Sequence, residues 1–252
     1  MTVWLPILED FNNKLLLKEV IGMKKCVLRI TILSLIFCIF LSMKCVVSNA
    51  AVQIWDSSAK KYRSYTIYNQ STISDTYIKN HGCGTCCLTT LLHAYGKRQS
   101  LGPKQVHKKL EKKIFGSSFD KSHPLGLNGI KKVLLKNNIS AVYYAGTYGK
   151  SYIKSKLKSH LSKGKPAVVL LKGNSKYNCA KKISGFHYIL LLKYNANTKK
   201  VVVGDSSGKY TRTHYESLDS IVTCMVKGKS GSSYPYYLNK RKTNGGMLLI
   251  TE

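Results

Sequence analysis

Residues 186–205, FHYILLLKYNANTKKVVVGD, constrain the fold more than any other part of the sequence. Two apolar runs flank the short polar segment NANTK, a pattern typical of an antiparallel β-hairpin. Facing residues in such a hairpin have a constant index sum, so a turn centred on Ala196 pairs His187 with Asp205. The sequence therefore predicts that an imidazole and a carboxylate share one face of a sheet, close enough for the carboxylate to orient the ring.

The remaining periodic segments predict an α+β domain. Helical patterns come first and strand-like runs gather later, an order that favours helices packed on an antiparallel sheet. Helices are expected at about 84–95, 101–115, 126–136, 151–164 and 216–226, and strands at 141–146, 167–173, 186–194, 200–205 and 245–250, after an extended lead-in at 52–70.

Three cysteines open the first helix, in HGCGTCCLTTLLHAYG (81–96). Cys83 lies at the helix N-terminus between two glycines, where unpaired amides and the helix dipole stabilise a thiolate. A nucleophilic thiol needs a base and a group that orients this base. His187 is the candidate base because it opens a strongly apolar strand, and Asp205 is the candidate orienter. A hydrogen-bonded core histidine and a simple Asp-Ser-Ser-Gly turn are the structural alternatives.

The first 50 residues have the pattern of a targeting segment. A basic stretch begins at Met23, an uncharged apolar run follows at 30–43, and VVSNA ends with small residues spaced for signal-peptidase cleavage. A retained membrane anchor is the alternative, but after cleavage we expect no stable membrane span and a secreted protein. Three segments are expected: an untranslated or mis-annotated extension at 1–22, a signal peptide at 23–50, and a folded domain at 51–252.

The charge is strongly basic, with 41 Lys and Arg against 11 Asp and Glu and a net charge of +30. The bases are spread along the chain instead of forming one tail. For a secreted protein this favours contact with anionic cell-wall polymers, membrane surfaces or acidic substrates, although a generally basic and soluble surface explains it equally well. Nucleic acid is not an expected partner, because no nucleic-acid-binding motif accompanies the charge.

Eight cysteines become five once the signal peptide is removed. An odd number leaves at least one thiol unpaired within the monomer, which in a secreted protein points to a reactive thiol. Cys179 and Cys224 can pair with each other, with Cys86 or with Cys87, and the sequence does not choose among these pairings.

Two of these motifs carry a family resemblance. HGCGTCCLTTLLHAYG resembles the Cys-Gly-Pro-Thr-Ser helix, with its Tyr-Gly end, of the bacteriocin-leader-peptidase-like (peptidase C39-like) cysteine peptidases. GFHYILLLKYNANTKKVVVGDSS is similar to the Gly-x-His strand and the Asp-containing strand of that family, and the resemblance spans about 65–226. It implies a papain-like fold, a peptide or protein substrate and no cofactor or metal. It also implies that Cys83 is the nucleophile, His187 the general base and acid, and Asp205 its orienter.

The resemblance further implies an upstream glutamine that stabilises the oxyanion. Gln70 is the best match and Asn80 the second candidate, and an ordinary loop amide is the alternative for both. The backbone amide of Cys83 is expected to be the other donor. The sequence departs from the family at Thr85-Cys86-Cys87, where Pro-Thr-Ser or small residues are usual. We expect Cys86 and Cys87 to be structural thiols in a buried helix face.

Other functions share parts of this pattern. Cys83 and Cys86 have the spacing of a dithiol oxidoreductase, but the polar segment before them is not the apolar strand that such a fold needs, and that function has no use for His187 and Asp205. Zinc binding lacks a second ligand pair. Transglutaminase-like enzymes share the Cys-His-Asp order, and a non-catalytic cell-wall-binding module on the same fold is also open. We expect a secreted cysteine peptidase.

Overall fold

An antiparallel six-stranded sheet, in the order β3-β8-β4-β5-β6-β7, organises the domain. Its central strands β4 and β5 are buried on both faces, which explains why their sequences are continuous apolar runs. The strands are β3 (Ala141–Tyr144), β4 (Ala167–Lys172), β5 (Phe186–Asn195), β6 (Lys200–Gly204), β7 (Thr213–Ser217) and β8 (Met247–Ile250).

The computed structural model describes the chain from residue 51 onward, with gaps. The predicted upstream extension and signal peptide, 1–50, lie outside the described residues. The described residues all belong to one unit, Asn49–Glu252. They are 51–116, 123–145, 148–181, 183, 185–208, 213–226 and 245–251.

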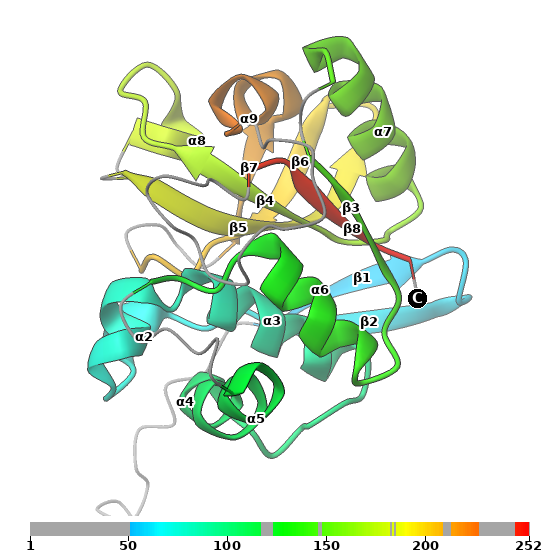
Figure 1. The fold of residues 1–252 in the computed structure, drawn as a ribbon. Coiled ribbons are helices and arrows are strands. Elements are labelled where there is room, and N and C mark those ends of the chain that lie inside the picture. Colours follow the sequence, from blue (N-terminus) through cyan, green and yellow to red (C-terminus); the bar gives the residue numbers. More distant parts are fainter. Residues whose placement is uncertain are drawn as a thin grey trace, which may run out of the picture. The chain divides into compact units, whose positions relative to one another are not determined.

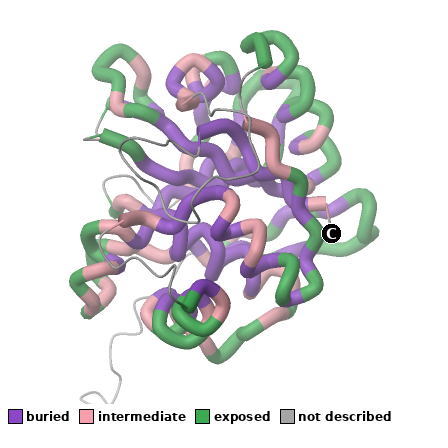
Figure 2. Tube along the Cα trace, in the orientation of Figure 1, coloured by how far each residue is buried: buried purple, intermediate pink, exposed green. Residues whose placement is uncertain are grey.

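Helices cover both faces of the sheet (Figure 1). Along β5, Tyr188 and Leu190 face one hydrophobic core and Ile189 and Leu191 face the other, as the alternation of a strand requires. The buried residues follow the sheet and the inner faces of these helices (Figure 2). The first core is completed by α3 (Cys83–Ala94) and α6 (Leu127–Leu135), and the second by α7 (Lys150–Ser162), α8 (Asn178–Lys181) and α9 (Leu218–Cys224).

The lead-in to the first helix is a β-hairpin of its own, formed by β1 (Ala51–Asp56) and β2 (Lys61–Thr66). A buried ion pair holds it, with Arg63 Nε 2.8 Å from the Asp56 carboxylate. The Arg63 guanidinium lies 3.8 Å from the centre of the Tyr95 ring at the end of α3. The hairpin is thereby attached to the helix that begins with Cys83.

The α+β prediction and the papain-like fold are confirmed, and the predicted helices at 84–95, 126–136 and 151–164 appear within a residue or two. The predicted helix at 101–115 is wrong as a continuous α-helix. It consists of α4 (Pro103–Gln105), a π-helical stretch η2 (Val106–Glu111) and α5 (Lys112–Phe115). The helix expected to begin at Glu216 begins two residues later, because Glu216 and Ser217 complete β7, an edge strand that the sequence analysis missed.

Two short helices that the sequence analysis missed lie close to the ends of the main elements. They are α2 (Thr76–His81), which directly precedes α3, and α8 in the β4–β5 connection. Within the described parts of the chain, no helix combines the length and the hydropathy needed to cross a membrane.

Candidate active site

The start of α3 is fixed by its two glycines. Helix α2 is capped by the Asp75 carboxylate and ends at Gly82, whose own carbonyl accepts the first helical hydrogen bond of α3. A Cβ on Gly82 would lie 2.4 Å from the carbonyl oxygen of Ile78, and one on Gly84 would lie 2.3 Å from that of Leu125. Both neighbours are backbone atoms that cannot rotate away, so only glycine fits on either side of Cys83.

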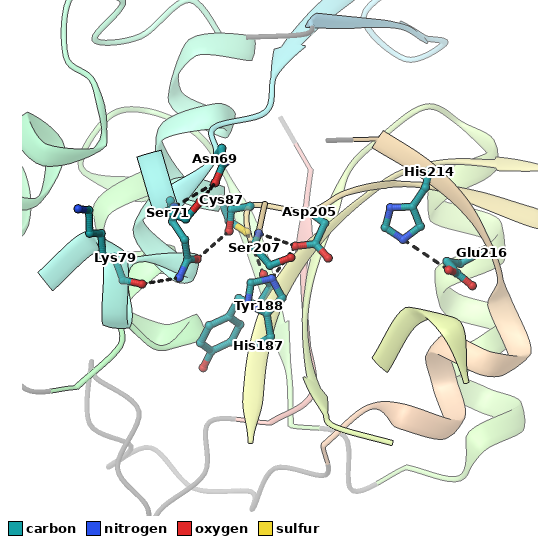
Figure 3. A network of polar contacts seen from close by, with 12 residues as sticks. Asn69, Ser71, Lys79, Cys87, His187, Tyr188, Asp205, Ser207, His214 and Glu216 are labelled. Carbon is teal, nitrogen blue, oxygen red and sulfur yellow. Dashed lines mark hydrogen bonds and ion pairs between the residues drawn. The ribbon is translucent and has the colours of Figure 1, made fainter. Parts of the chain in front are cut away.

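His187 and Asp205 meet as the hairpin pattern predicted. The Nε2 atom of His187 donates to Oδ1 of Asp205 across 2.7 Å, and both side chains are buried. The backbone amide of Ser207 also donates to Oδ1 of Asp205 at 2.7 Å and orients the carboxylate. Figure 3 shows the imidazole and the carboxylate pointing toward one another.

The register behind this contact differs from the prediction. Leu190 faces Gly204, and a β-bulge between Leu191 and Lys193 shifts the rest of the ladder. Continuing the register of Leu190 and Gly204 would place His187 opposite position 207, so Asp205 is its diagonal neighbour and not its direct partner. An even shift keeps a side chain on the same face of a sheet, which is why the predicted contact survives a wrong register.

Cys83 contacts His187 where β5 extends beyond the end of its neighbour β6. The β5–β6 ladder stops at Gly204, and beyond it the backbone of Tyr188 faces α3. The Tyr188 amide donates to the sulfur of Cys83, and the Cys87 thiol donates to the Tyr188 carbonyl oxygen at 3.7 Å. Helix α3 thus takes hydrogen bonds that a longer β6 would have made, and it sets Cys83 within hydrogen-bonding contact of His187.

The electrostatics of the three groups favour a charged pair. Burial opposes ionisation of Cys83, but its hydrogen bond and charge interaction with His187, and the amides of Tyr188 and Gly84, hold its pKa below the ordinary value. Burial also disfavours the His187 imidazolium, yet Asp205 and Cys83 together raise the pKa of this ring to about 10. The His187 ring and the Ser207 amide outweigh burial at Asp205 and lower its pKa. All three shifts act in the same direction and favour a Cys83 thiolate, a His187 imidazolium and an Asp205 carboxylate over their neutral forms.

The other two thiols of the helix behave differently. Burial raises the pKa of Cys86 and of Cys87 well above the ordinary value, and the neighbouring Cys83 charge raises both further. Both are buried and unoxidised, as expected for structural thiols. The chain enters Cys83 from helix α2 and not from a strand, which is the wrong context for a dithiol oxidoreductase.

Gln70 lies in the 3-10 turn η1 (Gln70–Thr72), between α2 and the loop that carries Asp205. Its side-chain amide donates to the carbonyl oxygen of Lys79 at 3.1 Å and accepts from Ser206 Oγ at 3.1 Å, and its backbone amide donates to the Ser206 oxygen at 2.8 Å. These contacts tie the lead-in segment to the residue next to Asp205. Asn80, the second candidate, is exposed on α2.

A buried network beneath the start of α3 was missed from the sequence. Thr85 Oγ1 donates to Glu111 at 2.7 Å, and His107 Nδ1 lies 2.6 Å from the other oxygen of that carboxylate. The Tyr77 ring stacks on His107 with its centre 3.7 Å away. The four-residue spacing of His107 and Glu111 could have revealed their pairing on a helix, but nothing in the sequence connects them to Thr85.

Metal binding finds no support in the part of the chain that the structure describes. Among those residues, no three or more His, Cys, Asp or Glu side chains are arranged to hold a metal ion.

The fold and the site together define a class. An α+β domain in which a cysteine at a helix start faces a histidine and an aspartate on an antiparallel sheet has the arrangement of the papain-like cysteine peptidases. A model of the Peptidase C39-like family matches residues 62–236, more than half of the chain, and the chain belongs to this family. The resemblance stated from the two motifs is thus confirmed, and at the level of the family the chain is a cysteine peptidase. No curated protein matches it significantly.

Proposed function

We propose that this protein hydrolyses peptide bonds with a catalytic triad of Cys83, His187 and Asp205. The observation that carries the proposal is the continuous contact from the Asp205 carboxylate through the His187 ring to the Cys83 sulfur, at the start of a helix. A preformed thiolate–imidazolium pair supplies both the nucleophile and the acid that acyl transfer requires.

In the proposed reaction, the Cys83 thiolate attacks the carbonyl carbon of a peptide bond and forms a tetrahedral intermediate. The His187 imidazolium then protonates the leaving amine, the C–N bond breaks, and a thioester with Cys83 remains. The now neutral imidazole takes a proton from water, and the hydroxide attacks the thioester and releases the carboxylic acid. Asp205 holds the ring in place and stabilises its positive form throughout.

The oxyanion of the intermediate needs hydrogen-bond donors. We propose the Cys83 backbone amide and the side chain of Gln70, whose amide group carries a second N–H besides the one given to Lys79. Loss of one such donor typically lowers the rate about 10²–10³-fold. The ties between Gln70 and Ser206 support this role, because they hold the amide beside the Asp205 loop.

We also propose that the protein acts outside the cell after removal of residues 23–50, with the upstream extension 1–22 absent. The motif of basic, apolar and small residues supports this. The remaining chain keeps 41 − 6 = 35 Lys and Arg against 11 − 3 = 8 Asp and Glu, and its net charge of +27 suits contact with anionic cell-wall polymers. The substrate is a peptide or protein in that environment.

Iodoacetamide labelling of the folded, reduced protein near neutral pH tests the nucleophile. We expect fast labelling at Cys83, assigned by fragmentation of the tryptic peptide 80–97. His187→Ala should slow it strongly, and Cys86→Ala is the matched control, because it removes a buried thiol of the same helix and should leave the Cys83 rate unchanged. Labelling of Cys83 and Cys86 together, and only after dithiothreitol, would favour the oxidoreductase instead.

Hydrolysis itself is tested by labelling new amino termini. Proteins from the outside of the producing cells are incubated with the wild-type protein, with Cys83→Ala and with Cys86→Ala. New termini that require Cys83 and persist in Cys86→Ala would support a peptidase. New isopeptide cross-links instead of termini would indicate a transglutaminase-like enzyme. Sedimentation with purified cell walls, with neither product formed, would indicate a binding module.

A further inference from the structure

A second pair of thiols lies on the opposite face of the sheet from Cys83. Cys179 belongs to α8 and Cys224 ends α9, and both are buried in the second hydrophobic core. The two thiols lie within hydrogen-bonding contact of each other, and both are reduced. Side chains that touch in this way need only small rotations to reach the bonding distance of a disulfide.

The two cysteines belong to segments that are held very differently. Cys224 is followed by Met225, which bridges to Leu171 of β4, and by Val226, whose amide donates to the Leu170 oxygen at 2.9 Å. The end of α9 is therefore fastened to the centre of the sheet.

Cys179 lies in the β4–β5 connection, residues 173–185. Among its described residues, 173–181, 183 and 185, the backbone hydrogen bonds are local ones: the Gly173 amide donates to the Gly185 oxygen at 2.8 Å, and the Asn174 amide donates to the Ala180 oxygen at 3.1 Å. Its short helix α8 packs against α9 (Figure 1). The connection ends directly before Phe186 and His187, so its position matters to the start of the strand that carries His187.

We infer that Cys179 and Cys224 are a redox-modification site, at which the two thiols close into a disulfide that fastens the β4–β5 connection to the sheet. In this step one thiolate attacks an external low-molecular-weight disulfide, such as oxidised glutathione, and releases one thiolate. The second cysteine displaces the other half as a thiolate, and the two protons of Cys179 and Cys224 end on the released thiols. The protein pair loses two electrons, and the external disulfide gains them.

The surroundings of the pair suit a structural bond and not a reactive dithiol. Burial raises the pKa of both thiols, and the nearby Glu216 carboxylate raises both further. Glu216 itself is largely buried beside His214, with 3.5 Å between the His214 Nε2 and a carboxylate oxygen. The folded protein should consequently form and lose this disulfide slowly, and the bond closes most readily before the connection has packed.

Peptide mapping after incubation with oxidised glutathione tests the pairing. The reduced protein is unfolded, refolded in a glutathione redox buffer, alkylated and digested with trypsin without reduction. The two cysteines fall in separate peptides, 177–181 and 213–227, while Cys83, Cys86 and Cys87 share the peptide 80–97. We expect a linked pair 177–181 with 213–227, lighter by two hydrogens than the sum of the two reduced peptides.

Thermal unfolding gives the second measurement. The cross-link restricts the unfolded chain, so the oxidised wild type should unfold roughly 10 °C above the same protein treated with a phosphine reductant. The double variant Cys179→Ser/Cys224→Ser should show no dependence on the reductant. Cys86→Ser, which alters a buried thiol outside the pair, should keep the full shift and serves as the matched control.

The outcome does not depend on the proposed peptidase, because Cys83→Ala should form the same linked peptides and show the same shift. Two singly alkylated peptides after oxidative refolding would overturn the inference. Linkage of either peptide to 80–97, or a mixed disulfide with glutathione at both positions, would overturn it as well. Loss of Cys83 labelling in the presence of the 179–224 link would contradict the proposed function alone.

Discussion

Cys83 and Cys179 are both buried thiols packed against the same sheet, one on each face, yet their pKa values move in opposite directions. Burial opposes ionisation at both. At Cys83 the His187 ring and two backbone amides more than compensate, whereas at Cys179 the Cys224 thiol and the Glu216 carboxylate add to the penalty. Burial alone thus makes a cysteine inert, and directed donors make it a nucleophile. If both proposals hold, the sheet between the two cores would also separate the reactive thiol from the disulfide-forming pair.

Replacement of His187 should have the largest effect on the difference in reactivity between Cys83 and Cys179. His187→Ala removes the strongest donor to the Cys83 thiolate and the acid of the proposed reaction, so we expect hydrolysis to fall at least about 10³-fold. Rapid alkylation of Cys83 should fall with it, toward the slow rate of Cys179. The control is His214→Ala on β7 of the same sheet, which should retain both rates. An unchanged alkylation rate in His187→Ala would mean that the helix N-terminus alone activates the thiol.

The pH dependence of hydrolysis should report the ionisation of Cys83 and that of His187 separately. Below the depressed pKa of Cys83 the thiol is protonated and hydrolysis stops, and above the His187 pKa of about 10 the ring loses the proton that the leaving amine needs. We expect a bell-shaped profile of kcat/KM with its basic limb near pH 10. A basic limb near the ordinary histidine value would contradict the raised pKa of His187.

Asp205→Asn should narrow this profile from both sides. Without the carboxylate the His187 pKa falls, and the less charged ring stabilises the Cys83 thiolate less, so the acidic limb moves up and the basic limb moves down. We expect a loss of roughly 10²-fold at the optimum. A parallel loss at every pH, with both limbs in place, would show that Asp205 matters only for folding.

Gly84→Ala should show how far the reactivity of Cys83 depends on its position, because the substitution moves the thiol without changing any charge near it. The added Cβ lies 2.3 Å from the Leu125 backbone oxygen, so α3 must shift, and we expect about 1–3 kcal/mol of lost stability together with slower Cys83 alkylation. Gly149→Ala is the control, because its Cβ would meet only the Ser151 hydroxyl, at 4.0 Å. Urea unfolding of both variants measures the difference, and equal stabilities would contradict the tight fit.

Glu216→Gln should give the smallest effect. Removal of the charge lowers the pKa of Cys179 and Cys224, and thiolates exchange faster than thiols, so the pair should oxidise a few-fold faster in glutathione buffer. The alkylation rate of Cys83 should not change. Equal oxidation rates in wild type and variant would show that access to the buried pair, and not its ionisation, limits the reaction.

The parts of the site that follow local sequence rules could be predicted. The helix start at Cys83 and the contact between His187 and Asp205 needed only a glycine-flanked cysteine and the two-residue period of strands. The exact register could not be predicted, because the β-bulge near Leu191 leaves no compositional signal. The predicted roles of Cys83, His187, Asp205 and Gln70 remain predictions.

Contacts that depend on packing between distant segments could not be predicted from the sequence. The amide of Tyr188 reaches Cys83 where the β5–β6 ladder stops at Gly204, and Thr85 meets Glu111, a residue 26 positions away at the end of the π-helical stretch. The sequence around Tyr188 and around Thr85 contains no pattern that indicates these contacts. The missed strand β7 likewise has no alternation strong enough to identify it, since it lies at the edge of the sheet with a mixed burial pattern.

The end of β6 at Gly204 also bears on when, during folding, the surroundings of Cys83 form. A Cβ on Gly204 would lie 2.5 Å from the Ile67 side chain, so the lead-in segment packs directly against the end of β6 in the second half of the chain. The proposed nucleophile precedes its base by about a hundred positions, and loops of that length close late in folding. In a nascent or partly folded chain Cys83 therefore lacks the His187 ring and the Tyr188 amide that lower its pKa. The thiol acquires this environment only when the whole domain is complete.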